Sequence, residues 1–199
     1  MLVPERPLGK RRLERLHSTG MERSARRRRA SGTTVVGVIA DTHGLLRPEA
    51  VAALAFVDLI VHAGDIGSAA LLDALATIAP VLAVRGNNDR GRWAAALPET
   101  VTTEIAGVRL HVVHDLKTLR GDPAALGVDV VISGHSHKPR VEHRSGLLLL
   151  NPGSAGPRRF SLPIAVARLS LRRSGARAEI VELQRGLDGA KVRGAVSPP

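Results

Sequence analysis

Five short polar clusters stand where apolar runs of the chain end, and they carry the residue types that bind divalent cations. Together they supply four carboxylates, two asparagines and four histidines. Carboxylate oxygens and imidazole nitrogens suit Mn, Fe, Zn or Ni ions, and one carboxylate can bridge two ions that activate a water. The pattern therefore predicts a metal-dependent hydrolase. The clusters are Asp41-Thr42-His43, Gly64-Asp65, Gly86-Asn87-Asn88-Asp89, His114-Asp115 and Gly134-His135-Ser136-His137.

Each cluster follows a segment with the composition of a buried β-strand, rich in Val, Ile and Leu. In open α/β folds, ligands bind in the loops beyond the carboxyl ends of the strands. We therefore expect the five clusters to meet at one edge of the fold. The strands expected are residues 34–40, 59–63, 81–84, 110–113 and 128–133.

Helix-like stretches alternate with the first strands, whereas hairpins dominate the second half of the chain. Residues 48–56 begin at a proline, and Ser68 is suited to cap a helix over 69–78. A shorter helix is expected near 122–126. This order predicts an α/β fold built as a two-sheet β-sandwich flanked by helices, in a single domain. The hairpins expected pair 101–105 with 108–113, 140–143 with 147–150, and 164–171 with 176–183.

Composition excludes several classes of protein. The 199 residues suit one domain, and a hydrophobic fraction of 44% with only 2% aromatics predicts an aliphatic core. Cysteine is absent, which excludes disulfides, zinc fingers and cysteine nucleophiles and is compatible with a cytoplasmic location. No apolar run approaches the ~18 residues that span a bilayer, so no membrane association is expected.

Positive charge is concentrated in the first 32 residues. This segment contains ten Arg or Lys and three Glu, including four consecutive arginines at 26–29, out of a net charge of +11 for the chain. Such a block stays solvated, and no apolar stretch typical of a secretory signal follows it. We expect a disordered basic arm at 1–32, a folded domain at 33–185 and a loose Gly- and Pro-containing tail at 186–199.

Taken together and in this order, the five clusters resemble the motifs of the calcineurin-like metallophosphoesterase superfamily. The chain length, the spacing and the sequence Asn151-Pro152-Gly153-Ser154 are similar to those of its YfcE-like single-domain phosphodiesterases. The resemblance covers roughly residues 34–170. It implies a two-sheet sandwich with a dinuclear metal centre, which agrees with the fold expected from the strand pattern.

The resemblance also implies which side chains bind the metals. Asp65 corresponds to the carboxylate that bridges the two ions. Two divalent ions are implied, with Mn²⁺ preferred and Ni²⁺, Fe²⁺ or Zn²⁺ as alternatives. The first site would comprise Asp41, His43 and His137, and the second Asn87, His114 and His135.

Two positions depart from the family pattern. Many members carry a histidine where this chain has Asn88, and an asparagine cannot act as a general acid. The second histidine of the usual His-Gly-His motif is also missing, because Asp115-Leu116 follows His114. Asp115 is either a hydrogen-bond partner for an imidazole or a plain loop residue.

Other residues near the clusters have supporting roles or none. Asp89 is expected to orient the loop of Asn88 through hydrogen bonds. Arg85 either steadies an anionic ester together with Asn88 or forms a surface salt bridge. His62 and His111 lie within apolar strands and are expected to be packed, hydrogen-bonded histidines.

The reaction implied is hydrolysis of a small phosphoester, preferably a phosphodiester, by a water held between two metal ions. Phosphomonoesters and phosphoproteins remain alternatives, and an oligomer is compatible with the sequence. A second hypothesis is a non-catalytic scaffold for protein interaction, because the retromer subunit uses this architecture in that way. A nucleic-acid-binding protein acting through the basic arm ranks last, because aromatic side chains for base stacking are nearly absent.

Overall fold

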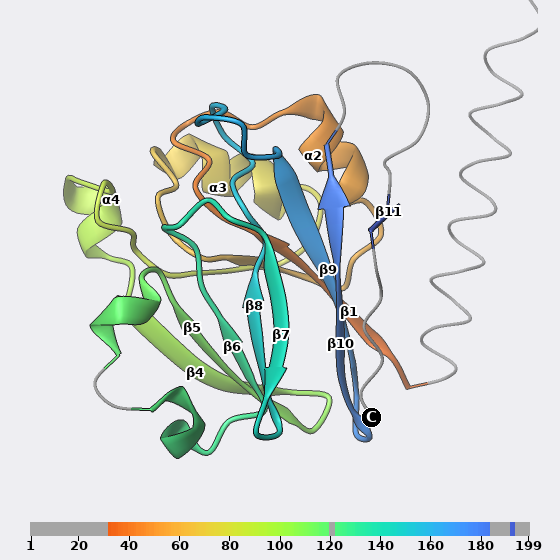
Figure 1. The fold of residues 1–199 in the computed structure, drawn as a ribbon. Coiled ribbons are helices and arrows are strands. Elements are labelled where there is room, and N and C mark those ends of the chain that lie inside the picture. Colours follow the sequence, from red (N-terminus) through yellow and green to blue (C-terminus); the bar gives the residue numbers. More distant parts are fainter. Residues whose placement is uncertain (1–31, 120–121, 184–191, 194–199) are drawn as a thin grey trace, which may run out of the picture.

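Two β-sheets pack face to face in the computed structural model, which describes residues 32–119, 122–183 and 192–193 (Figure 1). One sheet comprises β1 (Thr34–Ile39), β2 (Leu59–His62), β3 (Val81–Ala83), β9 (Ala165–Arg172), β10 (Gly175–Glu182) and β11 (Val192–Arg193). The other comprises β4 (Thr100–Ile105), β5 (Val108–Val113), β6 (Val130–Ile132), β7 (Arg140–Arg144) and β8 (Leu147–Asn151). Their strand orders are β11-β10-β9-β1-β2-β3 and β4-β5-β6-β8-β7. The predicted two-sheet sandwich is therefore confirmed.

Parallel pairing brings the polar clusters to one edge of the sandwich. Strands β1, β2 and β3 are mutually parallel neighbours in the first sheet, and β5, β6 and β8 are parallel neighbours in the second. The two sheets meet at their carboxyl ends, where the backbone N–H of His135 after β6 donates to Oδ2 of Asp41 after β1 at 3.0 Å. Each of the five clusters follows one of β1, β2, β3, β5 and β6, as the sequence predicts.

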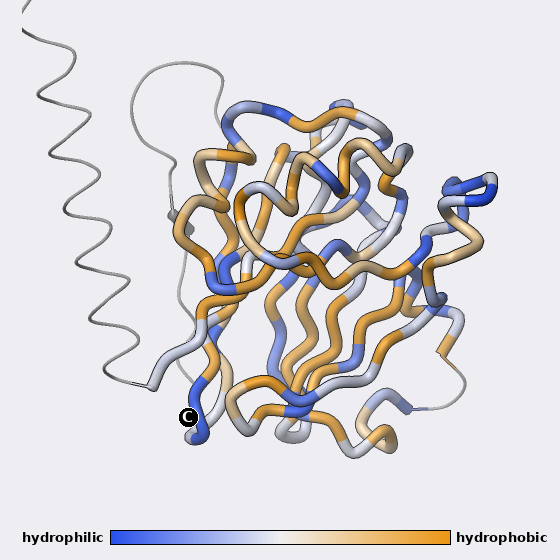
Figure 2. Tube along the Cα trace, turned by 180° about the vertical axis from the view of Figure 1, so that it is seen from behind, coloured by the Kyte–Doolittle hydropathy of each residue, from blue (hydrophilic) through white to orange (hydrophobic). Residues whose placement is uncertain are grey.

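Aliphatic side chains fill the layer between the sheets. In β1, Val36 and Val38 point into this layer, whereas Val35 and Ile39 point to the opposite face of the same sheet. This alternation follows from the two-residue period of a strand. Figure 2 shows hydrophobic stretches along the strands and hydrophilic residues in the loops that connect them. Burial of both faces of β1 fixes its register and hence the position of the loop that follows it.

Two helices cover the outer face of the six-stranded sheet, α2 (Pro48–Ala53) and α3 (Ala69–Ala76) (Figure 1). The helix cap predicted at Ser68 is present, because its hydroxyl accepts a hydrogen bond from Leu71 N at 3.3 Å. Close packing of α2 on β1 requires Gly37, where an added Cβ would lie 2.5 Å from Cδ2 of Leu54.

Several helices differ from the sequence prediction. The helix predicted over 48–56 ends at Ala53, and Phe56 has a left-handed φ of 62° that no helix can continue. Residues Pro123–Leu126 form a 3₁₀ helix rather than the predicted α-helix, because Gly127 stops the segment in the left-handed conformation after one turn. Two short segments were not predicted, α4 (Arg92–Ala95) and the 3₁₀ helix Leu116–Thr118.

The two ends of the chain lie mostly outside the described residues. The predicted basic arm falls there, except for Gly32. In the segment predicted as a loose tail, the structure describes Val192–Arg193, which pair as β11 with β10. Among the described residues, none of the helices is long and apolar enough to cross a lipid bilayer.

Candidate metal centre

Five of the candidate ligands have left-handed backbone conformations. The φ angles are 54° at Asp41, 47° at His43, 54° at Asp65, 65° at His135 and 58° at His137. A residue with a Cβ pays roughly 1–2 kcal/mol for this conformation, so it persists only where surrounding structure enforces it. Such residues concentrate at functional sites, and their coincidence with the predicted ligands supports a site here.

Backbone hydrogen bonds enforce these conformations. The loop after β1 pairs with the loop after β2 through Asp41 N to Gly64 O at 3.0 Å and His43 N to Asp65 O at 2.9 Å. Gly44 N continues the ladder to Ile66 O at 2.8 Å. The two loops therefore form one rigid unit in which the side chains of Asp41 and Asp65 are fixed relative to each other.

Two glycines allow neighbouring loops to approach the carboxylate of Asp65. A Cβ on Gly86 would lie 2.1 Å from Asp65 N and 2.2 Å from its Oδ1. Gly64 has a φ of +89°, and a Cβ there would lie 2.6 Å from Nδ1 of His114. The glycines in these clusters therefore serve close packing around the site as well as turning the chain.

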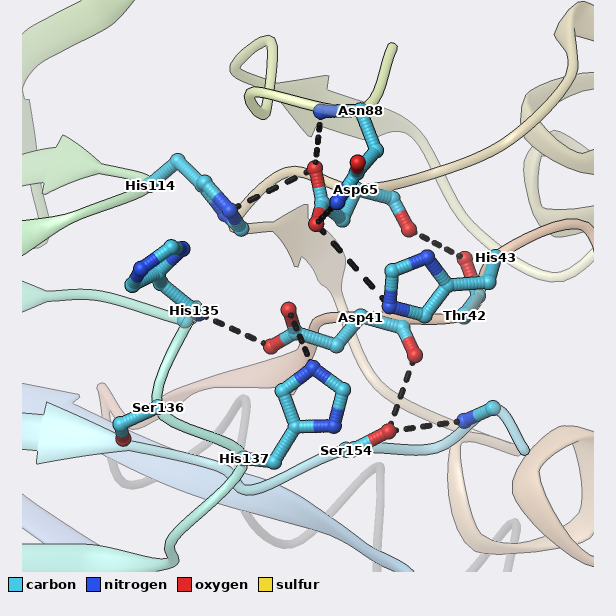
Figure 3. Close-up of polar contacts among 12 residues, drawn as sticks. Asp41, Thr42, His43, Asp65, Asn88, His114, His135, Ser136, His137 and Ser154 are labelled. Carbon is cyan, nitrogen blue, oxygen red and sulfur yellow. Dashed lines mark hydrogen bonds and ion pairs between the residues drawn. The ribbon is translucent and has the colours of Figure 1, made fainter. Parts of the chain in front are cut away.

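A first group of donor atoms gathers around Asp41 (Figure 3). Its Oδ1 lies 3.2 Å from Nε2 of His137, and the rings of His137 and His43 stack with centroids 5.4 Å apart. One ligand atom from each of these three residues lies within 4.8 Å of the other two. The predicted first set of ligands is thus brought together.

A second group gathers on the other side of Asp65. Its Oδ1 lies 3.4 Å from Nε2 of His114, and Oδ1 of Asn87 lies 3.0 Å from both His114 Nε2 and His135 Nδ1. Asp65 Oδ2 faces the first group, 3.9 Å from Nε2 of His43. The Asp65 carboxylate therefore stands between both groups, in the position expected of a bridging ligand.

Buried polar atoms that lack hydrogen-bond partners also indicate that the site fits divalent cations, independently of any sequence motif. Asp41 Oδ1 and His43 Nε2 are buried yet have no hydrogen-bond partner among the described residues. An unsatisfied buried polar atom costs about 1–3 kcal/mol, and more if charged. Cations coordinated here would satisfy both atoms. His114 Nδ1 lies 2.8 Å from the carbonyl oxygen of Ala63, which orients the imidazole so that Nε2 faces Asp65.

The charges of the site reinforce one another. Burial raises the pKa of Asp65, but hydrogen bonds from His114 and Asn88 outweigh it and hold that pKa below its usual range. Burial lowers the pKa of His114, but the hydrogen bond to Asp65 and the carbonyl of Ala63 raise it above its ordinary value. Asp65 is therefore anionic at neutral pH and available to a metal ion.

The three residues predicted to support the site occupy different places. Asn88 contacts Asp65 directly, through N to Oδ1 at 2.8 Å and Nδ2 to Oδ2 at 2.6 Å. Asp89 accepts hydrogen bonds from the backbones of Gly67 and Gly86, each at 2.8 Å, which orients the loop that carries Asn88. Arg85 forms an ion pair with Glu99, the surface salt bridge that the sequence analysis gave as its alternative.

A cavity of about 550 Å³ opens beside the second group. His114, His135 and Asp115 line it together with Arg85, Arg90, Glu99 and Thr118. Asp115 Oδ2 lies 3.7 Å from Nε2 of His135, beyond hydrogen-bond distance, and its Oδ1 accepts a hydrogen bond from Lys117 N at 3.0 Å. Asp115 therefore caps its own loop and lies next to the imidazole of His135.

Sequence analysis missed the part played by Asn151 at the end of β8. Its Nδ2 donates to the carbonyl of Gly134 at 2.6 Å and lies 3.2 Å from Oγ of Ser136, while its Oδ1 accepts from Gly153 N at 2.9 Å. The side chain thus ties the loop of His135 and His137 to β8. The available sequence signal was the cluster Asn151-Pro152-Gly153-Ser154, which follows an apolar strand but does not by itself indicate the partners of this amide.

His62 supports the centre through a hydrogen bond with Thr42 and is not itself a candidate ligand. The side chain is fully buried, as predicted, and its Nε2 lies 2.9 Å from Oγ1 of Thr42. The Thr42 hydroxyl has one proton, which it donates to Ile66 O at 2.9 Å, so it accepts from His62 Nε2. His62 Nδ1 has no partner among the described residues, and burial followed by the nearby charge of His114 lowers the pKa of His62 to about 3.

We predict that Asn151→Ala weakens metal binding about tenfold, in the range typical of residues that orient metal ligands. The physical reason is release of the loop that carries His135 and His137. Calorimetric titration of metal-free protein with Mn²⁺ measures the effect. Ser136→Ala removes the longer of the two hydrogen bonds donated by Asn151 and one from Lys138 N, but keeps the bond to Gly134, and should change the affinity less. Equal affinity for Asn151→Ala and wild type would contradict the assignment.

We predict that His62→Gln makes the free energy of unfolding depend less steeply on pH below pH 6.5. The unfolded state binds a proton at His62 near pH 6.5 and the folded state only near pH 3. The free energy of unfolding should therefore fall as pH drops through this window, by about 1.4 kcal/mol per pH unit for one group. Glutamine keeps an N–H for Thr42 but cannot take up a proton. Denaturant unfolding between pH 6.5 and 4.5 measures the slope, and identical slopes would refute the prediction.

The chain is similar to known proteins of one superfamily. The model of the calcineurin-like phosphoesterase superfamily domain matches residues 35–174. A probable metallophosphoesterase of Methanocaldococcus jannaschii is 42% identical over 136 residues, which cover 62% of this chain and 69% of that protein.

Solved structures share the fold. Vps29 of Entamoeba histolytica, in complex with Zn²⁺, has a TM-score of 0.65 at 25% identity, covering 82% of this chain and 98% of Vps29. An archaeal phosphodiesterase has a TM-score of 0.60 at 22% identity, covering 74% of this chain and all of the other. Because the family match spans most of the chain and includes every candidate ligand, the protein belongs to the calcineurin-like phosphoesterase superfamily, which uses divalent metal ions.

Proposed function

We propose that the protein hydrolyses phosphodiesters with a water activated by two divalent metal ions. The observation that carries the proposal is the convergence of seven candidate ligands from five loops, with the carboxylate of Asp65 between the two groups. Buried donor atoms without partners support the presence of cations. Membership of a phosphoesterase superfamily supplies the reaction class.

The candidate ligands would hold two metal ions. Asp65 would contact both ions. When bound, the ions would lower the pKa of a shared water and neutralise charge on the phosphoryl oxygens. The first ion would be held by Asp41, His43 and His137, and the second by Asn87, His114 and His135.

Asn88 and Asp115 would shape the chemistry around the ions. The amide of Asn88, next to the Asp65 carboxylate, is placed to donate a hydrogen bond to a phosphoryl oxygen. It cannot donate a proton to the leaving group, so substrates whose leaving groups need no protonation are favoured. Asp115 lies beside Nε2 of His135, so Nδ1, which faces Asn87, would be the nitrogen left for the metal.

A diester is preferred over a monoester because the chain resembles the single-domain phosphodiesterases of the family, and the site has room for an ester substituent. The cavity of about 550 Å³ beside His114 and His135 can accept an ester substituent. The fold is shared with an archaeal phosphodiesterase, which supports the same class. Mn²⁺ remains the preferred ion, and Zn²⁺ is the ion found with the similar Vps29. The domain boundaries at residues 33 and 185 and a cytoplasmic location stay predictions from the sequence.

The test is hydrolysis of bis(p-nitrophenyl) phosphate and p-nitrophenyl phosphate by metal-stripped protein to which Mn²⁺ is returned. We expect Mn²⁺-dependent cleavage that favours the diester and falls by at least about a thousandfold in Asp65→Ala and His135→Ala, because each loses a group that positions the activated water. His143→Ala is the matched control, since this histidine lies exposed on β7 away from the site. Metal-independent turnover would contradict the proposal.

A second function, a non-catalytic scaffold for protein interaction, is favoured by the likeness to Vps29, a vacuolar protein sorting protein. The two functions make different predictions. A scaffold would bind metal but turn over neither ester with Mn²⁺, Ni²⁺, Fe²⁺ or Zn²⁺. The full set of candidate ligands gathered at the centre favours catalysis.

A further inference from the structure

The loop between β8 and β9 begins in direct contact with the metal centre. The hydroxyl of Ser154 donates to the carbonyl of Asp41 at 2.9 Å (Figure 3), and Ala155 N donates to Ala40 O at 3.1 Å. A Cβ on Gly156 would lie 2.4 Å from the carbonyl oxygen of Asp41. The base of the loop therefore packs on the backbone of a candidate ligand.

The loop is also fixed on its far side. Arg47 donates from Nε and Nη2 to the carbonyl of Gly156, at 3.3 and 3.1 Å. Leu162 N donates to Arg159 O at 3.2 Å and closes a turn. These contacts hold the intervening tip, Arg158-Arg159-Phe160, on a rigid base beside the centre.

The tip presents an aromatic ring and two cations to solvent. Phe160 is 90% exposed, more than any other large hydrophobic side chain that the structure describes, and its φ of 53° is left-handed. Arg158 and Arg159 are exposed and form no ion pair with another described residue. Gly156, two residues before Arg158, packs on the loop of the first group, because an added Cβ would lie 2.5 Å from the carbonyl oxygen of Thr42.

The tip and the cavity flank the centre on opposite sides. Figure 3 shows His43 on one side of the two aspartates and His114 and His135 on the other. The cavity opens beside His114 and His135, whereas the base of the tip packs at Gly156 against the backbone of Thr42, the neighbour of His43. A substrate with its phosphorus over the centre could therefore extend one substituent into the cavity and the other over the tip.

We propose that Arg159 and Phe160 form a subsite for a nucleoside ester, in which Arg159 contacts a phosphoryl oxygen and Phe160 stacks on the base. This proposal rests on the proposed function and names its substrate class, a nucleotide diester. A guanidinium matches phosphate oxygens, and an exposed aromatic face stacks on any nucleobase. An exposed ring next to the guanidinium of Arg159 and beside a candidate metal centre suits a planar, anionic ligand. The small number of aromatics argues for a single nucleoside rather than a polymer.

The first test compares two esters with the same leaving group, thymidine 5′-(p-nitrophenyl phosphate) and methyl p-nitrophenyl phosphate, at saturating Mn²⁺. Phe160→Ala should raise KM about tenfold for the thymidine ester only, without lowering kcat, because one stacking contact is lost. Phe160→Trp should restore KM, and Phe160→Leu should not. Arg159→Gln should raise KM for both esters, and the matched control Arg158→Gln should change neither.

The second test measures binding without turnover, which separates this proposal from the proposed function. Calorimetric titration with thymidine 5′-monophosphate and with inorganic phosphate should show about tenfold tighter binding of the nucleotide, a difference that Phe160→Ala abolishes. If neither ester is hydrolysed but this difference is found, the subsite stands and the hydrolase proposal fails. If hydrolysis occurs and Phe160→Ala alters neither KM nor nucleotide affinity, the subsite is refuted and Phe160 faces another partner, such as a protein.

Discussion

The buried carboxylate of Asp41 is the constraint on which this edge of the molecule depends. Asp41 is fully buried at the end of β1, and its four polar groups reach three different loops. Its N–H and carbonyl pair with Gly64 and Ser154, and its two carboxylate oxygens face the backbone of His135 and the ring of His137. A carboxylate removed from water is costly unless charge and hydrogen bonds compensate it. The loops after β2, β6 and β8 are therefore positioned by one residue, and cations complete the compensation.

The departures from the family pattern fall at the border of the centre rather than within it. The seven candidate ligands are all present, whereas Asn88 and Asp115 lie beside two of them, the carboxylate of Asp65 and the ring of His135. Because Asn88 replaces an ionisable histidine, the site gains a fixed hydrogen-bond donor and loses a proton donor. The chemistry of this chain would thus rest more on the metal ions and on binding of the substrate than on side-chain acid catalysis.

The strand pattern and the polar clusters were enough to predict the sandwich and the convergence of the clusters, because buried strands carry a strong apolar signal and parallel pairing follows from it. Short helices were predicted poorly. Phe56 ends α2 through its backbone conformation, and Gly127 limits residues 123–126 to one 3₁₀ turn, features that tertiary contacts decide. The amide of Asn151 was missed because its partners, Gly134 and Ser136, come from a distant part of the chain. For the same reason, the sequence could not decide whether Arg85 forms a salt bridge, as it does with Glu99, or contacts an ester.

The most direct test of the central claim is anomalous X-ray diffraction from crystals of the protein grown with Mn²⁺. The account predicts two anomalous peaks about 3.5–4 Å apart, with Asp65 between them. Asp41, His43 and His137 should contact one peak, and Asn87, His114 and His135 the other. A single peak, or two peaks that Asp65 does not bridge, would contradict a dinuclear centre in this protein.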